Sequence, residues 1–321
     1  MKRDPPDVLV LRGKPHGISS REYARALDER LPANVTVEAA KTPAEERAMI
    51  TDTPVVTGGD IGDGLLSAAD ELALFACTAA GYEHLPVEPM AESGIAVTNA
   101  AGVHGPNIAE HVLGSFLAFA RGFFRARRQQ ARHEWRGFQS RELDGTRVVI
   151  VGMGAIGQSI VDRLAGFDVT TAGVRYTPEK GGPTDEVYGF GDIHEALAGA
   201  EYVAIATPLT DETRGLIGTD ELATLPPSAV LVNVARGPIV ETDALVEAVQ
   251  ANHLRGVALD VTDPEPLPND HPLWDFENVF ITPHTSGHTP EYFDRLADIV
   301  APNVEIVLGD GDLADLENRV V

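Results

Sequence analysis

Six short apolar runs recur through the second half of the chain, separated by stretches long enough for helices. Runs of four to eight β-branched and apolar residues bounded by Gly or Pro are typical of buried strands. Strands alternating with helices favour a parallel sheet, and six of them suffice for a doubly wound nucleotide-binding fold. The runs cover residues 147–152, 169–174, 202–208, 230–237, 256–261 and 279–284.

The first hundred residues carry a second, smaller α/β pattern. Polar, helix-compatible stretches such as 19–31 and 43–50 separate its strand-like runs, which predicts another mostly parallel sheet. A length of 321 residues suits two such domains. We also expect one long helix over 106–130 and a further helix from about 290. The strand-like runs of this region are 8–12, 35–39, 54–57, 71–77 and 95–99.

The chain is strongly acidic, with 49 acidic residues against 25 lysines and arginines and a net charge of −24. Such a surface repels nucleic acid and anionic membranes, so neither is expected as a partner. A charge magnitude of about 2–8 suffices for solubility, and concentrated salt screens the excess because the Debye length falls to about 3 Å at 1 M. We therefore expect a halophile's cytoplasmic protein; the alternative is an acidic mesophilic one.

Targeting signals and disulfides are not expected. No run of 18 or more apolar residues is present, and the start, MKRDPPDVLV, lacks the apolar segment of a signal peptide. The single cysteine, Cys77, excludes an internal disulfide. It lies in the apolar run ELALFAC, so it is expected to be buried rather than reactive.

A glycine-rich loop, VVIVGMGAIG, follows the first strand of the second series and precedes a helix-like stretch. Gly152, Gly154 and Gly157 give the pattern G-x-G-x-x-G, which allows a tight turn and close backbone approach to a pyrophosphate. The alternative is an ordinary glycine-rich turn. The residues expected around a dinucleotide here are Gly152, Met153, Gly154, Ala155, Ile156 and Gly157.

The next strand departs from the usual NAD pattern. An acidic residue about twenty positions on normally holds the adenosine ribose hydroxyls of NAD. Here the strand runs into Arg175 and Tyr176, and no acid follows until Glu179. An arginine there can pair with a 2′-phosphate and stack on adenine. NADP(H) is therefore expected to be preferred, with NAD(H) as the alternative, unless Arg175 merely points to solvent.

Three polar residues each follow one of the later strand-like runs: Arg236, Glu265 and His284. Carboxyl ends of parallel strands line the ligand crevice of an open sheet, so these side chains should come together. Arg236 could hold the carboxylate and carbonyl oxygen of a 2-oxo acid. His284 could donate a proton while a reduced nicotinamide delivers hydride, and Glu265 could orient the imidazole and favour its charged form.

Each of the three also has a structural interpretation. Arg236 could be a surface charge in its Gly-Pro turn, Glu265 lies in the rigid turn DPEP, and His284 could cap a loop. No metal-ligand spacing with supporting carboxylates is present, so no metal site is predicted. Four other histidines are expected to be structural or solvated: His104, His111, His194 and His253.

Several longer motifs make residues 70–300 resemble the D-isomer-specific 2-hydroxyacid dehydrogenase family. They are ACTAAGYEHLPVE, IAVTNAAG, IAEHVLG, VGMGAIGQSI, TPLTDETRGLI, NVARGPIVETDAL, ALDVTDPEPLPNDHPLW and NVFITPHTSG. The resemblance implies a Rossmann-like cofactor domain over 101–290 and a flavodoxin-like substrate domain over 1–100 and 291–321. It implies that Arg236, Glu265 and His284 bind substrate and catalyse reversible hydride transfer between NAD(P)H and a 2-oxo acid, giving a D-2-hydroxy acid.

The same resemblance implies further site residues. Asp260 would contact the nicotinamide amide, with Thr207, Pro208 and the Ala235 backbone lining the cofactor cleft. Backbone amides of Thr78, Ala79, Ala80 and Gly81 would help hold the substrate carboxylate. The cleft would close about hinges near residue 100 and 287–291. Family members are commonly homodimers joined through the long helix and arm, here about 106–142, and Trp135 is a candidate to reach the neighbouring subunit's site.

Other members of the same fold offer alternatives. Formate dehydrogenases place an amide where Glu265 stands, which argues against that activity here. Many phosphoglycerate dehydrogenases carry a regulatory domain, for which this chain leaves no room; a glyoxylate or hydroxypyruvate reductase remains open. A dinucleotide-sensing corepressor-like protein is the non-enzymatic alternative, and the acidic surface weighs against it.

Overall fold

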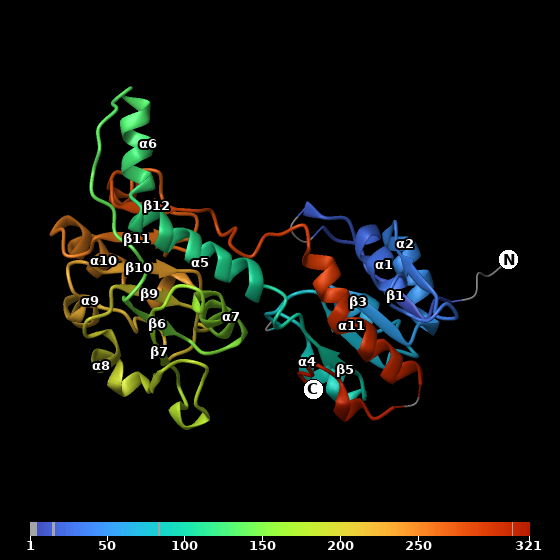
Figure 1. The fold of residues 1–321 in the computed structure, drawn as a ribbon. Coiled ribbons are helices and arrows are strands. Elements are labelled where there is room, and N and C mark those ends of the chain that lie inside the picture. The colour runs from blue at the N-terminus through green and yellow to red at the C-terminus, as the bar shows by residue number, and fades with distance from the viewer. Residues whose placement is uncertain (1–4, 15–16, 83, 310) are drawn as a thin grey trace. The chain divides into compact units, whose positions relative to one another are not determined.

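The computed structural model describes residues 5–14, 17–82, 84–309 and 311–321. The chain divides into two compact units: residues 1–103 with 288–321 form the first, and residues 104–287 form the second (Figure 1). The chain passes from one unit to the other at residues 103–104 and again at 287–288. In the described residues, no helix combines the length and the apolar character needed to cross a membrane.

The second unit is built on one parallel sheet in the order β12-β11-β10-β9-β6-β7-β8. The chain runs outward from β6 through β7 to β8 and then returns to β9 on the other side of β6, so the strand order reverses at β6. This is the doubly wound topology expected from the sequence. The strands are β6 (Arg147–Val151), β7 (Thr170–Val174), β8 (Glu186–Tyr188), β9 (Tyr202–Ile205), β10 (Val230–Asn233), β11 (Gly256–Leu259) and β12 (Val279–Ile281).

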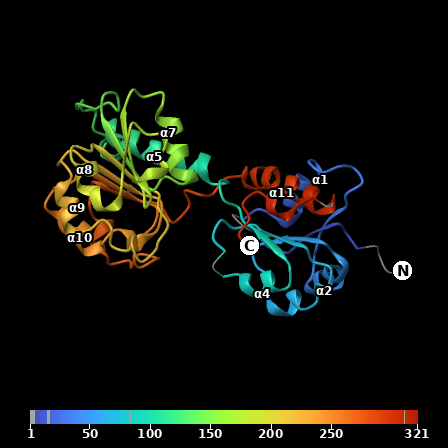
Figure 2. The same ribbon diagram turned by 90° about the horizontal axis from the view of Figure 1, so that it is seen from below.

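Helices cover both faces of this sheet, as Figure 2 shows. α5 (Gly105–Ala120) and α7 (Ala155–Leu164) pack on one face, against Val148 and Ile150 of β6. The opposite side chains of that strand, including Val149, pack against the other helices. A strand that is apolar on both faces is the signature of a buried parallel sheet. The helices of the second face are α8 (Ile193–Leu197), α9 (Thr219–Thr224) and α10 (Thr242–Gln250).

The first unit repeats this plan around a five-stranded parallel sheet in the order β2-β1-β3-β4-β5. α1 and α11 cover one face and α2 and α4 the other (Figure 2). The five predicted strands are confirmed, and Cys77 at the end of β4 is buried as expected. The elements are β1 (Val8–Val10), α1 (Ser20–Asp28), β2 (Val37–Ala39), α2 (Pro43–Met49), β3 (Val55–Gly58), α3 (Asp63–Leu66), β4 (Leu74–Cys77), α4 (Val87–Glu92), β5 (Ala96–Thr98) and α11 (Tyr292–Leu308).

The prediction of a single helix over 106–130 is wrong. The segment forms α5 and a separate helix α6 (Phe123–Ala131), which stands away from the sheet in Figure 1. Gly122 interrupts the helix with φ +69°, a left-handed conformation that glycine adopts readily. A Cβ at this position would lie 2.6 Å from the ring of Phe138, so the ring also requires glycine here.

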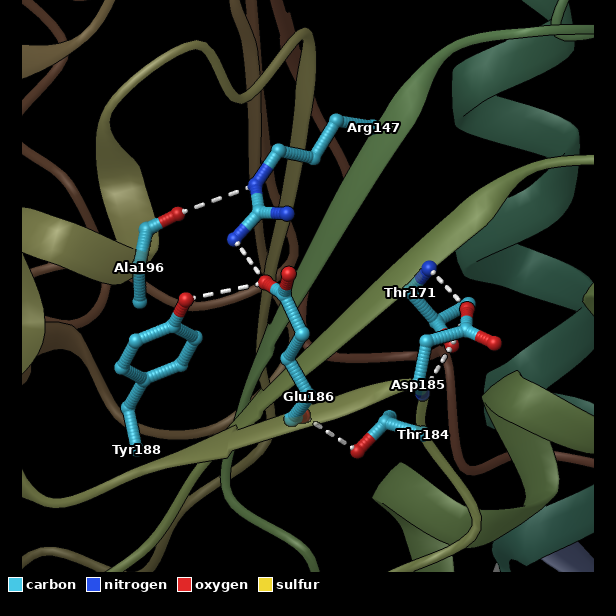
Figure 3. Close-up of polar contacts among 7 residues, drawn as sticks. All are labelled: Arg147, Thr171, Thr184, Asp185, Glu186, Tyr188 and Ala196. Atoms are coloured by element: carbon cyan, nitrogen blue, oxygen red, sulfur yellow. Dashed lines mark hydrogen bonds and ion pairs between the residues drawn. The ribbon is translucent and has the colours of Figure 1, made fainter.

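The sequence analysis also missed an edge strand, β8. Asp185 anchors its start by accepting hydrogen bonds from the amide and hydroxyl of Thr171 at 2.7 and 2.8 Å (Figure 3). Glu186 pairs with Arg147 at 2.7 Å and accepts a hydrogen bond from the Tyr188 hydroxyl at 2.9 Å. These contacts hold the three-residue strand against β7.

Six short 3-10 helices complete the secondary structure of the described residues. They are η2 (Ile50–Asp52), η3 (Pro178–Lys180), η4 (Phe190–Asp192), η5 (Gly237–Ile239), η6 (Pro272–Trp274) and η7 (Leu313–Asp315).

Candidate active site

The glycine loop lies between β6 and α7, at the point where the strand order reverses. Gly152 has φ +108°, and a Cβ there would lie 2.5 Å from the carbonyl of Ala206. A Cβ on Gly157 would lie 1.9 Å from the Gly152 oxygen. Gly154 differs, because nothing lies within 4 Å of its Cβ position. Two glycines therefore serve the fold, and the third leaves open space where a pyrophosphate can approach the start of α7.

A pocket of about 560 Å³ lies beside this loop. The segment after β7 lines one side and the segment after β9 lines the other, so the two flank the glycine loop at β6. Seven residues of the predicted cofactor set line it: Gly152, Met153, Gly154, Arg175, Tyr176, Thr207 and Pro208.

Seven other lining residues were missed by the sequence analysis, and two of them, Thr177 and Lys180, lie in the segment after β7. One signal could have found the second of them. Lys180 is the only lysine between residues 104 and 287, in a chain whose basic residues are almost all arginines.

The imidazole and carboxylate predicted from the sequence do meet. Nδ1 of His284 lies 2.5 Å from Oε1 of Glu265. Glu265 follows β11 and His284 follows β12, and these strands are neighbours in the sheet. Both side chains are partly exposed, so the pair is open to a ligand. A carboxylate in this position orients the ring and sets which nitrogen is available for chemistry.

Arg236 follows the next strand, β10, and is exposed. Its guanidinium donates a hydrogen bond to the Ala235 carbonyl at 2.8 Å, and no hydrogen bond joins it to the described side chains of Glu265 or His284. Asn233 shapes the turn by donating to the Arg236 carbonyl and accepting from the Ala235 amide. The remaining N–H groups of the guanidinium can bind a planar carboxylate.

Gly237 explains how Arg236 is brought near the loop that carries Glu265. A Cβ on Gly237 would lie 1.9 Å from the Thr262 carbonyl oxygen, so only glycine permits this approach. The turn after β10 therefore packs directly on the loop after β11.

Asp260 is buried just behind the His284 loop. Its Oδ1 accepts hydrogen bonds from the Thr282 hydroxyl and the Thr285 amide at 2.6 and 2.9 Å, and its Oδ2 accepts from the Ser286 amide at 2.9 Å. Burial alone would raise the pKa of Asp260, but the hydrogen bonds from Ser286, Thr282 and Thr285 outweigh it and hold the pKa below its usual value. Asp260 is thus an ionised anchor for the segment that presents His284.

The other predicted histidines have structural contacts. His111 lies 3.5 Å from the Thr282 hydroxyl, and burial lowers its pKa although Asp260 opposes the shift. His104 contacts the Gly287 carbonyl, His194 contacts Thr224 and Glu221, and His253 contacts the Leu225 carbonyl.

The loop proposed to bind the carboxylate, Thr78–Gly81, follows β4 in the first unit. Its first two amides are engaged, because Thr78 donates to the Gly58 carbonyl and Ala79 donates to the Cys77 sulfur. The amides of Ala80 and Gly81 donate to no described residue. If this loop binds an anion through its backbone, Ala80 and Gly81 supply the donors.

A glycine loop at the strand reversal, with an imidazole–carboxylate pair at neighbouring strand ends, defines the class of dinucleotide-dependent oxidoreductases. The comparisons with known proteins agree and are more specific. Residues 113–286 match the model of the D-isomer specific 2-hydroxyacid dehydrogenase, NAD binding domain. The chain belongs to this family, whose members are NAD(P)-dependent oxidoreductases.

Individual relatives cover most of the chain. It is 32% identical over 295 residues to a D-3-phosphoglycerate dehydrogenase of Methanocaldococcus jannaschii, covering 91% of this chain and 56% of that longer protein. It is 31% identical over 315 residues to a glyoxylate reductase of Pyrococcus furiosus, covering 93% and 91%. A crystal structure from Xanthobacter autotrophicus in complex with NADPH and MES has a TM-score of 0.79 at 26% identity, covering 98% of each chain.

Proposed function

We propose that this protein reduces the carbonyl of a small 2-oxo acid to a D-2-hydroxy acid, with NADPH preferred over NADH. The observation that carries the proposal is the 2.5 Å contact between His284 and Glu265 at the carboxyl ends of strands in a dinucleotide-binding sheet. In this direction the nicotinamide supplies a hydride to the carbonyl carbon. The C=O bond becomes a C–O bond, and its oxygen takes a proton.

His284 supplies that proton from Nε2, since Nδ1 is committed to Glu265. Glu265 keeps the ring oriented and offsets the charge of the protonated imidazole. Arg236 binds the carboxylate of the substrate and polarises its carbonyl. The reverse reaction uses the same groups, with neutral His284 accepting the hydroxyl proton.

The remaining predicted residues belong to the same proposal. Asp260 contacts the nicotinamide amide, and Ala235, Thr207 and Pro208 line the cofactor site. In the loop Thr78–Gly81, the amides of Ala80 and Gly81 bind the substrate carboxylate, since those of Thr78 and Ala79 donate within the protein.

The preference for NADPH rests on Arg175. Arg175 stands where NAD-specific proteins of this topology carry an acid, and it lines the pocket next to the glycine loop. A guanidinium attracts a 2′-phosphate, whereas an acid would repel it.

We also propose a homodimer joined through α5, α6 and the arm up to residue 142. None of the nine residues of α6 is buried, and Trp135 in the arm is fully exposed. Six residues of α6 and residues 133–138 of the arm line a hollow of about 1310 Å³. Two of the lining residues, Phe123 and Trp135, are exposed large aromatic side chains, and exposed apolar groups gathered on one surface often mark an interface. A monomer in sedimentation at micromolar protein concentration would contradict this part of the proposal.

The net charge of −24 supports a further element, a working environment of concentrated salt.

The test of the main proposal is turnover. The protein is mixed with NADPH and a panel of 2-oxo acids, including glyoxylate, hydroxypyruvate and pyruvate, in concentrated KCl, and cofactor absorbance is followed. We expect oxidation of NADPH with at least one acid and a product of D configuration. Tight NADPH binding without turnover on any of them would indicate a dinucleotide sensor instead.

A further inference from the structure

The segment after β7 contributes two cations and the hydroxyl groups of Tyr176 and Thr177 to the cofactor pocket. Arg175, Thr177 and Lys180 all line this pocket together with Gly152 and Gly154. The segment from the β9 side contributes the one acidic side chain that lines the pocket in the described residues, Glu212. The β7 side is therefore a local cationic surface in a chain of net charge −24.

Hydrogen bonds within the segment close residues 175–181 into a compact turn. The Arg175 guanidinium donates to the Gly181 carbonyl. The amide of Lys180 donates to the Thr177 carbonyl at 3.2 Å, and the amide of Gly181 donates to the Pro178 carbonyl at 2.9 Å. Gly181 reverses the chain with φ +63°. The turn brings both cations of the segment, Arg175 and Lys180, to the same pocket.

The turn is also anchored at both ends. β7 leads into it, and the amide of Arg175 donates to the Tyr188 carbonyl in β8 at 3.0 Å. β8 is held in turn by the network of Arg147, Glu186 and Asp185 (Figure 3). A site supported in this way needs little reorganisation when a ligand binds.

The two cations differ in how they are engaged. The Arg175 guanidinium already donates one hydrogen bond to the Gly181 carbonyl, which holds it against the turn. The ammonium of Lys180 makes no hydrogen bond or ion pair with the described residues, and the side chain is exposed. Lys180 is thus the cation available to a ligand without breaking a contact in the protein.

We propose that Thr177 and Lys180, together with Arg175, form the binding site for the 2′-phosphate of NADP(H). Lys180 determines how strongly NADPH is preferred over NADH. This inference rests on the proposed function. A phosphate dianion offers three acceptor oxygens, which suits a guanidinium, an ammonium and a hydroxyl. NADH has a neutral ribose hydroxyl at that position, so it gains little from Lys180.

The experiment compares cofactor and fragment binding in variants of the full chain. Dissociation constants for NADPH, NADH, adenosine 2′-monophosphate and adenosine 5′-monophosphate are measured by calorimetry for the wild type, Lys180→Met and Thr177→Val. Lys41→Met in the first unit is the control, because it removes the same charge from the other unit. Melting curves confirm that each variant is folded.

We expect Lys180→Met to weaken NADPH and adenosine 2′-monophosphate at least about tenfold, the scale of one charge-assisted hydrogen bond. NADH and adenosine 5′-monophosphate should change less than about twofold, and Thr177→Val should show a smaller effect with the same selectivity. Lys41→Met should change none of the four. Restoring the charge with Lys180→Arg should recover most of the NADPH affinity.

Two failures are distinguishable. A wild type that binds NADPH and NADH equally refutes the cofactor preference in the proposed function, and with it the 2′-phosphate binding site. A wild type that prefers NADPH, with an unchanged preference in folded Lys180→Met, overturns the role of Lys180 and leaves Arg175 as the determinant. The fragment measurements involve no hydride transfer, so a failure of the proposed catalytic activity would not affect them.

Discussion

Glu265 Oε1 lies 2.5 Å from His284 Nδ1, and the histidine that makes this contact has φ +51°. Its amide donates to the carbonyls of Asp260 and Thr282 at 2.8 and 3.0 Å. These hydrogen bonds hold the backbone in a left-handed conformation that residues other than glycine rarely adopt. Such conformations cost about 1–3 kcal/mol and concentrate at functional sites. No described residue hydrogen-bonds to Nε2, so the strained backbone and the carboxylate together leave this nitrogen for a ligand.

The first prediction concerns this pair. His284→Ala should lower the rate of 2-oxo acid reduction about 100-fold or more, because the proton donor is lost. NADPH affinity should survive within a few-fold. Glu265→Gln should lower the rate less, since an amide oxygen can still accept from Nδ1 while the charge is gone. Steady-state kinetics and cofactor titration of both variants check this, and normal turnover in His284→Ala would refute the mechanism.

The glycine loop gives a prediction that separates folding from binding. Gly154→Ala should leave the melting temperature nearly unchanged, since the added methyl meets nothing within 4 Å, but it should weaken NADPH and NADH alike by tenfold or more by blocking the pyrophosphate. Gly152→Ala should destabilise the protein itself, because φ is +108° and Cβ would meet Ala206. Gly166→Ala, also with open space around it, is the matched control. Unchanged cofactor affinity in Gly154→Ala would place the pyrophosphate elsewhere.

Asp260 predicts a pH dependence of stability. Its pKa in the folded protein lies below the ordinary 3.8, so its contribution is fully present above pH 3.8 and is lost as the pH falls through the lowered value. The melting temperature of the wild type should therefore fall more steeply below that pH than that of Asp260→Asn. The substitution should itself lower the free energy of unfolding by about 1–3 kcal/mol near neutral pH. An amide N–H would then face groups that now donate hydrogen bonds to the Asp260 carboxylate.

Scanning calorimetry from pH 3 to 7 checks this, with Asp275→Asn, an exposed carboxylate, as the control. If the wild type and Asp260→Asn lose stability in parallel as the pH falls, Asp260 does not carry the effect.

Much of the fold follows from local pattern. The apolar runs at 147–152 and 256–261 predict strands because both of their faces are buried, and the side chains of β6 do pack in two different cores. The meeting of Glu265 and His284 could be predicted for the same reason. Each residue follows a strand, and parallel strands bring their carboxyl ends to one edge.

The misses have physical causes as well. β8 has no apolar run, since its three residues are Glu186, Val187 and Tyr188, and the strand depends on side-chain contacts to Arg147 and Thr171 that lie far away in sequence. Gly122 lies inside the stretch 106–130 that was expected to form one helix, but the ring of Phe138 packs where its side chain would be. No periodic pattern points to Lys180, because a 3-10 turn brings it to the pocket, and its being the only lysine between residues 104 and 287 was the one signal in the sequence.

The last prediction concerns salt. A net charge of −24 favours unfolding through self-repulsion, and the Debye length grows from about 3 Å at 1 M to about 10 Å at 0.1 M salt. Lowering KCl below roughly 0.5 M should therefore reduce the melting temperature as the repulsion is unscreened. An uncharged osmolyte such as sucrose favours compact states without screening charge. It therefore separates general stabilisation of the folded state from charge screening. If sucrose at low salt restores little stability whereas KCl restores most of it, charge screening is responsible. A melting temperature indifferent to KCl would refute the proposed adaptation to concentrated salt.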